Sequence, residues 1–320
     1  MNRREFLKAA FAGGALVATS RLPSLGEDDA SLFPERGKYE RLSLGYVTVR
    51  AGAAKPFSVL HISDTHLSAA YPDEGEKKLK LMDMRRRTFG GRQEEALRDS
   101  LSWAKDNVDY VVHTGDLIDW QSRANLDLVK KYFGDATFGS VGNHEFATDL
   151  WLSDPKPTKD EAWKERTRGP VAAAYPFDVV FHSRVVNGVN FVAMDDVYGT
   201  VTAGQAERFR AEARRGLPIV LCVHVPLFTD DIWRATTKFW AHAGRKFEDA
   251  AVPSPKGDYQ RQREDPVTRD FVAYLKSEPL LRAILAGHEH VTVQDRFSPT
   301  AAEFVVGANY MFCGQEVLFT

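Results

Sequence analysis

The chain has 320 residues, 43% of them hydrophobic and 27% charged, which is the composition of a globular protein with enough core for one large domain. The formal net charge of −2 excludes a general basic footprint for nucleic acid or for an anionic membrane surface. Two cysteines, Cys222 and Cys313, are too few for a disulfide framework, although a single bridge between them stays open.

Residues 1–26 have the pattern of an export signal. Arg3 and Arg4 precede Phe-Leu-Lys and then an apolar run over residues 9–17, which is short for a bilayer span but suits a signal-peptide core. The order Arg-Arg-x-Phe-Leu-Lys resembles the twin-arginine signal. The resemblance implies the twin-arginine export machinery as a partner of the precursor, and a periplasmic or otherwise exported bacterial protein without a stable membrane anchor after cleavage. The alternative is an amphipathic N-terminal helix.

Residues 27–43 are predicted to be a linker, because most of this stretch is polar and contains proline and glycine. Residues 44–320 show no internal repeat and are predicted to be a single domain. Its strands are predicted from five apolar, β-branched runs, at residues 57–62, 110–114, 136–141, 219–223 and 283–286.

Helical patterns lie between some of these strands. Residues 92–108 have apolar side chains at helical spacing, and residues 202–216 begin with Thr202 and Gln205 in the spacing of a capping box. Asn187-Gly188, between two apolar runs, predicts a tight hairpin. Strands that are apolar throughout and alternate with helices predict a buried α/β sheet.

Each predicted strand is followed by a short loop that contains Asp, Asn or His. In open α/β folds, ligands bind outside the carboxyl ends of the strands, so five such loops would deliver their side chains to one place. Any one loop alone reads as an ordinary turn, but the five together predict a metal site. The seven candidate ligands are Asp64, His66, Asp116, Asn143, His224, His288 and His290.

Seven ligands are too many for one tetrahedral ion, and the absence of thiolates argues against a structural zinc site. A carboxylate such as Asp116 can bridge two ions about 3.5–4 Å apart, as in two-metal hydrolases. Such a pair lowers the pKa of a bound water, supplies hydroxide near neutral pH and clamps the oxygens of an in-line displacement at phosphorus.

The motifs Asp64-x-His66, Gly115-Asp116-x-x-Asp119, Gly142-Asn143-His144-Glu145, His224 before Val-Pro, and Gly287-His288-x-His290 resemble those of the calcineurin-like metallophosphoesterases, in that family's order over roughly residues 57–291. The resemblance implies an αββα sandwich, in which two mixed β-sheets are flanked by helices.

The resemblance also implies how the ligands divide. Asp64, His66 and His290 would hold one ion, Asn143, His224 and His288 the other, and Asp116 would bridge them. His144 would face the substrate, where it would stabilise charge on the phosphoryl group or protonate the leaving oxygen. A His that only caps its loop is the alternative.

Two departures narrow the family. Purple acid phosphatases have a Tyr at the position of Asp119, and Gly or a similar residue in place of His66, so two divalent transition-metal ions (Mn, Fe or Zn) are expected instead of a ferric–tyrosinate centre. Asp119 and Glu145 are expected to orient a ligand or a loop. His61, His113 and His182 lie in apolar runs and are read as core or surface histidines.

Specificity is expected in two segments, residues 68–92 and 228–266, which are predicted to be irregular and to form lids. Basic side chains there could bind phosphate oxygens, with a solvated basic face as the alternative. The candidates are Arg85, Arg87, Arg92, His242 and Arg245.

The leading hypothesis is an exported metal-dependent phosphoric ester hydrolase that attacks a small phosphorylated substrate, monoester or diester, in line with a metal-bridging hydroxide. A binding protein that keeps the fold without catalysis is the first alternative, but such relatives usually lose ligands or the His of the Asn-His pair, and none is missing here. The second alternative is another kind of two-metal hydrolase, but the Glu-rich ligand set that is usual in such enzymes is absent.

Overall fold

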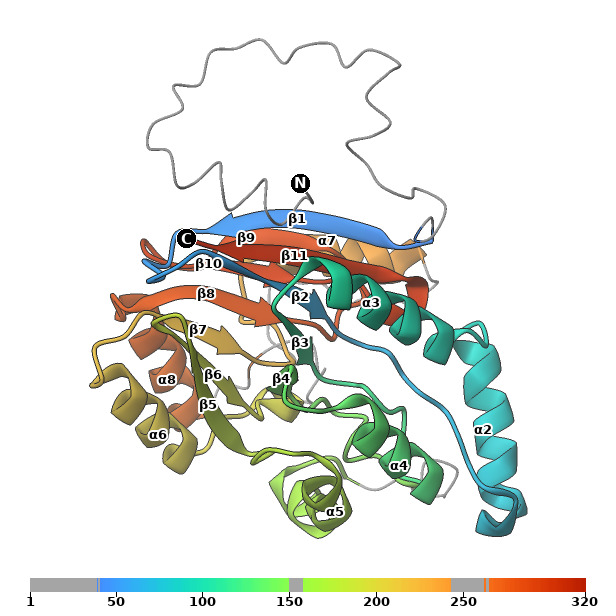
Figure 1. Ribbon diagram of the computed structural model, residues 1–320. Helices are drawn as coiled ribbons and strands as arrows, with labels where there is room; N and C mark the ends of the chain where they lie inside the picture. The colour runs from blue at the N-terminus through green and yellow to red at the C-terminus, as the bar shows by residue number, and fades with distance from the viewer. Residues whose placement is uncertain (1–38, 40, 150–157, 243–261, 263–264) are drawn as a thin grey trace, which may run out of the picture.

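Two mixed β-sheets packed face to face form the centre of the molecule in the computed structural model, which describes residues 39, 41–149, 158–242, 262 and 265–320 (Figure 1). The first sheet has the strand order β1 (Ser43–Val49), β11 (Cys313–Phe319), β2 (Phe57–Ile62), β3 (Tyr110–Thr114) and β4 (Thr137–Ser140). The second has the order β5 (Phe181–Val186), β6 (Val189–Met194), β7 (Ile219–Cys222), β8 (Leu281–Ala286), β10 (Ala302–Val305) and β9 (Val293–Arg296).

Both sheets combine parallel and antiparallel pairs. In the first, β1 runs parallel to β11, β11 antiparallel to β2, and β2, β3 and β4 parallel to one another. In the second, β6, β7, β8 and β10 are parallel, and the outer strands β5 and β9 are antiparallel to their neighbours. The parallel strands therefore present their carboxyl ends at a common edge.

Helices cover the outer faces of both sheets. In the first sheet α3 (Gln93–Asn107) and α4 (Arg123–Tyr132) pack on the strands, with α5 (Glu161–Ala174) beside α4, and α6 (Ala203–Ala213) and α8 (Pro266–Ser277) cover the second sheet (Figure 1). Two further helices lie near the edges, α2 (Glu76–Thr88) and α7 (Asp230–His242). The short 3₁₀ helices are η2 (Pro72–Glu74), η4 (Val197–Gly199) and η5 (Asn309–Met311).

The four layers (helices, sheet, sheet, helices) follow from side chains that point alternately to the two faces of each strand. In β6, Phe191 and Ala193 belong to the apolar cluster between the sheets, whereas Val192 and Met194 pack against α6 and α8. Both faces of such a strand are covered, so every residue of β6 is buried, and its sequence is apolar except for Asn190, which donates to Glu212 at 2.8 Å. The predicted αββα sandwich is therefore confirmed.

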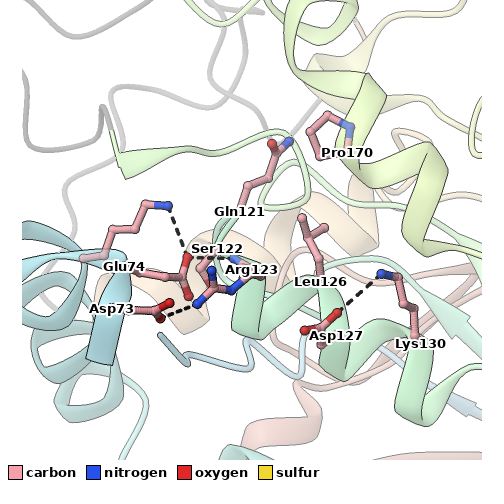
Figure 2. Close-up of a pocket in the computed structure, with 10 residues that line it drawn as sticks. Asp73, Glu74, Gln121, Ser122, Arg123, Leu126, Asp127, Lys130 and Pro170 are labelled. Carbon is pink, nitrogen blue, oxygen red and sulfur yellow. Dashed lines mark hydrogen bonds and ion pairs between the residues drawn. The ribbon is translucent and has the colours of Figure 1, made fainter. Parts of the chain in front are cut away.

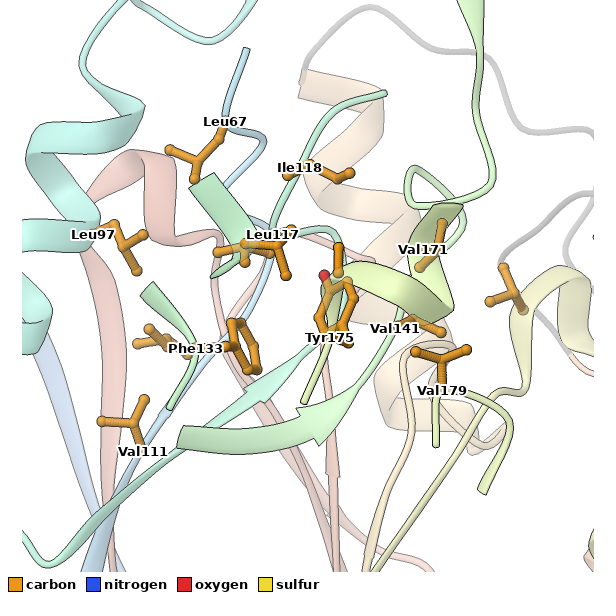
Figure 3. Close-up of a cluster of buried hydrophobic side chains, with 14 of the residues drawn as sticks. Leu67, Leu97, Val111, Leu117, Ile118, Phe133, Val141, Val171, Tyr175 and Val179 are labelled. Carbon is orange, nitrogen blue, oxygen red and sulfur yellow. The ribbon is translucent and has the colours of Figure 1, made fainter. Parts of the chain in front are cut away.

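The outer core of the first sheet continues beneath the loops at the strand ends. Leu67, Leu117, Ile118 and Val141 come from those loops and join the cluster that includes Tyr175 (Figure 3). Packing at this depth holds the loop backbones in place, because displacing any of these side chains would open a cavity.

Most predicted elements are found, with differences at their ends. The strands at 57–62 and 110–114 have the expected bounds, and the hairpin at Asn187-Gly188 has positive φ at both residues, 47° and 84°. Of the expected linker 27–43, residues 27–38 and 40 lie outside the described part of the chain, and Ser43 already begins β1. Both cysteines are free thiols.

The two expected lids are not wholly irregular, which corrects that prediction. The segment 68–92 contains η2 and the 13-residue helix α2, and the segment 228–266 begins with the 13-residue helix α7. Within the described residues, no helix is both long and apolar enough to cross a membrane.

Candidate metal centre

The loops after β2, β3, β4, β7 and β8 meet at one edge of the sandwich. They bring together all seven side chains that the sequence nominated as ligands, from Asp64 after β2 to His290 after β8. The β2 and β3 loops run side by side, since the backbone N–H groups of Asp64 and His66 donate to the carbonyls of Gly115 and Asp116 at 3.0 and 2.9 Å.

The backbone at this edge is unusual. Eight non-glycine residues in the described part of the chain have a positive φ, and five of them are candidate ligands: Asp64, His66, Asp116, His288 and His290, with φ between 53° and 68°. A non-glycine residue in this region costs of order 1–3 kcal/mol. The fold therefore holds strained loops where the polar side chains converge, which is typical of a functional site.

Glu145 fixes the β3 loop. Its buried carboxylate accepts the N–H groups of Asp116, Leu117 and Ile118 at 2.9, 2.8 and 3.2 Å, and that of Gly142 at 2.7 Å. The Tyr175 hydroxyl donates to the same carboxylate at 2.8 Å. Burial, aided by the nearby Asp116 carboxylate, raises the pKa of Glu145 to about 7, against the opposing effect of the N–H and hydroxyl donors.

The first group of ligand atoms comes from Asp64, His66 and His290. Asp64 Oδ1 lies 3.2 Å from His290 Nε2 and 3.8 Å from His66 Nε2, and the two Nε2 atoms are 3.3 Å apart. The other oxygen of Asp64, Oδ2, accepts the N–H of His288 at 2.8 Å, so only Oδ1 faces the two rings.

The second group comes from Asn143, His224 and His288, with Asp116 beside them. His224 Nε2 lies 3.2 Å from Asn143 Oδ1, 3.1 Å from His288 Nδ1 and 3.4 Å from Asp116 Oδ2. The same Asp116 oxygen is 3.7 Å from His66 Nε2 in the first group, so Asp116 lies between the two groups.

The residues fit a pair of cations. Asp64 Oδ1 is buried and has no hydrogen-bond partner among the described residues, which is costly without a cation beside it. His66 and His224 use their Nδ1 atoms on Asp119 Oδ1 and the Thr114 carbonyl, at 3.0 and 2.7 Å, and His290 Nδ1 lies 3.2 Å from the Tyr310 hydroxyl. Their Nε2 atoms are therefore left for the two ligand groups, His66 and His290 in the first and His224 in the second, and a set of imidazole and carboxylate donors suits Mn, Fe or Zn.

The electrostatics favour positive charge between the groups. Burial alone would raise the pKa of the Asp116 carboxyl, but His224 and His144 outweigh it and hold that pKa well below its usual range. Burial lowers the pKa of His66 to about 4 and that of His288 to about 3, so both rings are neutral and keep a lone pair for a metal ion. His224 behaves oppositely, because burial lowers its pKa but Asp116 raises it to about 10.

His144 belongs to neither of these two groups but lies next to His66, with ring centroids 4.5 Å apart, and His66, Asp119 and His144 form a third set of side chains that could hold an ion. His144 Nδ1 lies 2.8 Å from both the carboxylate Oδ1 and the carbonyl oxygen of Asp119, which leaves Nε2 facing the site, 3.9 Å from Asp116 Oδ2. Burial lowers the pKa of His144, but the carboxylates of Asp116 and Asp119 outweigh it and raise that pKa above its ordinary value. A raised pKa is what a proton donor needs near neutral pH.

Of the five candidate substrate contacts, the structure describes the side chains of Arg85, Arg87 and Arg92. Arg85 points at Asp119 and donates to it twice, whereas Arg92 pairs with the exposed Glu95 at 2.7 Å on α3. Arg87 is exposed on α2. His242 is the last residue of α7 and its side chain lies outside the described part of the structure, as does the whole of Arg245.

Three aromatic rings beside the site were not predicted from the sequence. Phe89 stacks on His66 with centroids 4.2 Å apart, and Tyr310 and Trp240 lie 5.3 and 5.2 Å from His290. None stands in or next to one of the five motifs, although Phe89 and Trp240 lie in the segments 68–92 and 228–266 that were expected to border the site. Phe89 follows α2, Trp240 lies on α7 and Tyr310 belongs to η5.

A separate hollow lies between η2 and α4; Gln121 and Ser122 at the end of the β3 loop line it, but none of the candidate ligands does (Figure 2). Its charged side chains are paired with each other: Lys78 with Glu74 at 3.2 Å, Lys130 with Asp127 at 3.4 Å, and Arg123 with Asp73. These pairs neutralise the hollow, so the metal centre is the stronger candidate for the functional site.

Two packed mixed sheets, with clustered His, Asp and Asn at their carboxyl ends, define a class of metal-dependent hydrolases. A family model for calcineurin-like phosphoesterases matches residues 57–292, and the chain belongs to that family. The family resemblance of the five motifs is thereby confirmed, and with it a hydrolase of the metallophosphoesterase type.

Solved structures of related fold include three from different sources. A dimetal phosphatase from Danio rerio is 14% identical, with 80% of this chain and 88% of that one covered and a TM-score of 0.46. A purple acid phosphatase from yellow lupin seeds, PPD1, is also 14% identical, with 81% and 45% covered and a TM-score of 0.44. The calcineurin-like phosphoesterase YfkN from Bacillus subtilis is 11% identical, with 80% and 82% covered and a TM-score of 0.39. Among curated proteins, none matches the sequence significantly.

Proposed function

We propose that the protein is an exported phosphoric ester hydrolase that uses two divalent transition-metal ions, Mn, Fe or Zn, to cleave a small phosphomonoester or phosphodiester. The observation that supports it most is the meeting of two ligand groups on either side of Asp116, with the nitrogen of His144 that is not hydrogen-bonded to Asp119 facing the same space. Export is proposed from the arginine pair at residues 3 and 4, which lie outside the described residues.

The ligands divide between two ions in this proposal. Asp64, His66 and His290 would hold one, Asn143, His224 and His288 the other, and Asp116 both. When bound, such ions lower the pKa of a water and polarise phosphoryl oxygens. Asp116 Oδ1 accepts the N–H of His144 at 2.8 Å, which fixes the carboxylate and leaves Oδ2 between the two groups.

His144 would act on the substrate. Because its Nδ1 is held by Asp119, its Nε2 can carry a proton toward the oxygen of the departing group. Protonation stabilises that oxygen as the phosphorus–oxygen bond breaks, and the need is greatest for alkyl groups, whose alcohols are weak acids. The retention of His144 beside a complete ligand set favours catalysis over a binding-only role.

The test combines metal analysis with a substrate panel. The chain without residues 1–26 is expressed with Mn, Fe and Zn supplied, and its metal content is measured before phosphomonoesters, phosphodiesters and pyrophosphates are offered. We expect about two ions per chain and hydrolysis of at least one ester class. A metal-loaded protein that binds phosphate esters without cleaving any of them would support the binding-only alternative. A wild type that takes up no metal would contradict the proposal as a whole.

A further inference from the structure

We infer that Arg85 is a positioning residue of the metal centre: it holds the Asp119 carboxylate, and through it the rings of His66 and His144. The inference goes beyond the five motifs, because Arg85 belongs to α2, in the segment between the first and second motifs. The activity measurements that test this inference rest on the proposed function, whereas the metal-binding measurements do not.

The contact between Arg85 and Asp119 is a two-pronged ion pair. Nε donates to Oδ2 at 2.5 Å and Nη2 donates to Oδ1 at 2.8 Å. The Asp119 side chain is fully buried and that of Arg85 is 14% exposed. Two parallel hydrogen bonds fix both the position and the plane of the carboxylate, which a single bond cannot do.

The fixed carboxylate then orients two rings. The Oδ1 atom that receives Arg85 Nη2 also lies 3.0 Å from His66 Nδ1 and 2.8 Å from His144 Nδ1. His66 belongs to the first ligand group and His144 is the proposed acid. One carboxylate therefore sets the direction of a ligand nitrogen and of a proton-donating nitrogen, and partners of this kind typically change metal affinity or activity 10–100-fold when removed.

The same helix turn supports His66 from a second side. Phe89 caps the C-terminus of α2, four residues after Arg85, and its N–H donates to the Arg85 carbonyl at 3.2 Å. The Phe89 ring stacks on the His66 ring at 4.2 Å with an interplanar angle of 12°, and the Arg85 guanidinium carbon lies 4.9 Å from the Phe89 centroid.

Few apolar contacts hold α2 otherwise. Leu81 is the one buried residue within the helix, and it packs with Trp120 and Ala147. Arg85 and Phe89 therefore connect the end of α2 to the metal centre, together with Arg86, whose Nε donates to the Ser68 carbonyl at 2.8 Å. Loss of Arg85 would leave the buried Asp119 charge with only imidazole donors on its side chain.

The test uses Arg85→Ala and Arg85→Lys in the full-length mature chain, with Lys80→Ala as the matched control. Lys80 lies on the same helix, has a 72% exposed side chain and pairs only with Glu76 among the described ion pairs. Metal affinity is measured by titrating metal-free protein with Zn or Mn against a chelator, and kcat and KM are measured on an alkyl and a nitrophenyl phosphate. Thermal melting reports folding.

Arg85→Ala is expected to weaken metal binding or kcat by roughly 10–100-fold with KM little changed, and Lys80→Ala to change neither. Arg85→Lys should recover part of the loss, because an ammonium can satisfy one carboxylate oxygen. If Arg85→Ala fails to fold, the Arg85→Lys measurements decide alone, and an unchanged metal affinity and kcat in that variant would contradict the inference.

A double-mutant cycle with Asp119→Asn separates positioning from direct contact. If Arg85 acts through Asp119, Arg85→Ala should add little to the loss that Asp119→Asn already causes. Additive losses would overturn the inference, and so would a raised KM with unchanged kcat and metal affinity, which would make Arg85 a substrate contact. A wild type without esterase activity would refute the proposed function, but the metal titrations would still decide the role of Arg85.

Discussion

His144 and His224 are two histidines of the same site whose surroundings differ. His224 Nε2 lies within 3.4 Å of three other candidate ligand atoms, whereas His144 Nε2 lies 3.9 Å from Asp116 Oδ2. His224 therefore belongs to the second ligand group, whereas His144 adjoins the first group through His66 and Asp119.

This difference predicts opposite consequences of one substitution. His144→Gln should keep about two metal ions and lower kcat by roughly two to four powers of ten, and less on nitrophenyl esters, whose leaving group needs little protonation. His224→Gln should lose metal first and activity in consequence. The measurement is metal stoichiometry and turnover on both variants. Equal loss of metal in the two would show that His144 is not the acid.

At this scale the sequence could indicate residue types but not their partners. The seven candidate ligands could be predicted because Asp, His and Asn follow the apolar runs, and the carboxyl ends of parallel strands meet at one edge of a sheet. The ion pair of Arg85 with Asp119 joins residues on α2 and on the loop after β3, and no local pattern encodes such a contact. The positive φ values at Asp64 and His66 are likewise a product of the loops being held from both sides.

The packing of the loop after β4 against the loop after β3 depends on Gly142, which follows β4. A β-carbon at Gly142 would overlap Asp116 Oδ1 and lie 2.5 Å from the Asp116 nitrogen. Gly142→Ala should therefore displace Asp116, lower the metal content and cost roughly 1–3 kcal/mol of stability through overpacking.

The control for that variant is Gly134→Ala, because a β-carbon at Gly134 would meet nothing within 4 Å and Gly134 precedes the same strand. Metal analysis and thermal melting compare the two proteins. Equal metal content and equal melting would show that the β4 loop accommodates a methyl group, against the close contact described above.

Neighbouring strands β2 and β3 also carry two buried histidines that are not candidate ligands. His61 Nε2 lies 2.9 Å from Thr114 Oγ1, and His113 Nε2 lies 3.0 Å from Thr65 Oγ1. Burial lowers the pKa of each to about 3 from an ordinary value of 6.5, with His113 adding to the effect at His61.

Because the folded state protonates these rings less readily than the unfolded state, their contribution to stability is complete above pH 6.5 and is lost as the pH falls toward 3. In that pH range each histidine can lower the free energy of unfolding by up to about 1.4 kcal/mol per pH unit. Urea unfolding of metal-free protein at pH 7.5, 6 and 5 should show the decline, and His61→Gln should reduce its slope. A slope unchanged by the substitution would assign the acid sensitivity to other groups.

Elements with a strong apolar signal were predicted well. The strands at 57–62 and 110–114 are almost continuously buried, so their composition alone indicates them. β9 reads VQDR and is largely exposed, and α2 reads EKKLKLMDMRRRT with one buried residue, so neither has an apolar pattern to detect. Their structure depends on tertiary neighbours, β10 for the strand and the metal-centre loops for the helix.

The whole molecule is proposed to be exported by the arginine pair near its N-terminus. Replacing both residues, Arg3→Lys with Arg4→Lys, should leave uncleaved precursor in the cytoplasm, because the twin-arginine route requires that pair. Cell fractionation with antibody detection measures the distribution. Unimpaired export of the variant would contradict the twin-arginine interpretation, and a mature protein found in both cases would indicate a different route.

The strand order of the first sheet has a consequence for the sequence of events during synthesis. β1 pairs with β11 over its full length, from Ser43 with Cys313 to Val49 with Phe319, and β11 also separates β1 from β2. A ribosome therefore releases β1 long before its neighbour exists, and the sheet cannot close until translation has passed β11. The attachment of β1 to the first sheet therefore follows the synthesis of β11, whereas Tyr39 and Arg41, just before β1, can already contact Asp106 and Glu95 of α3.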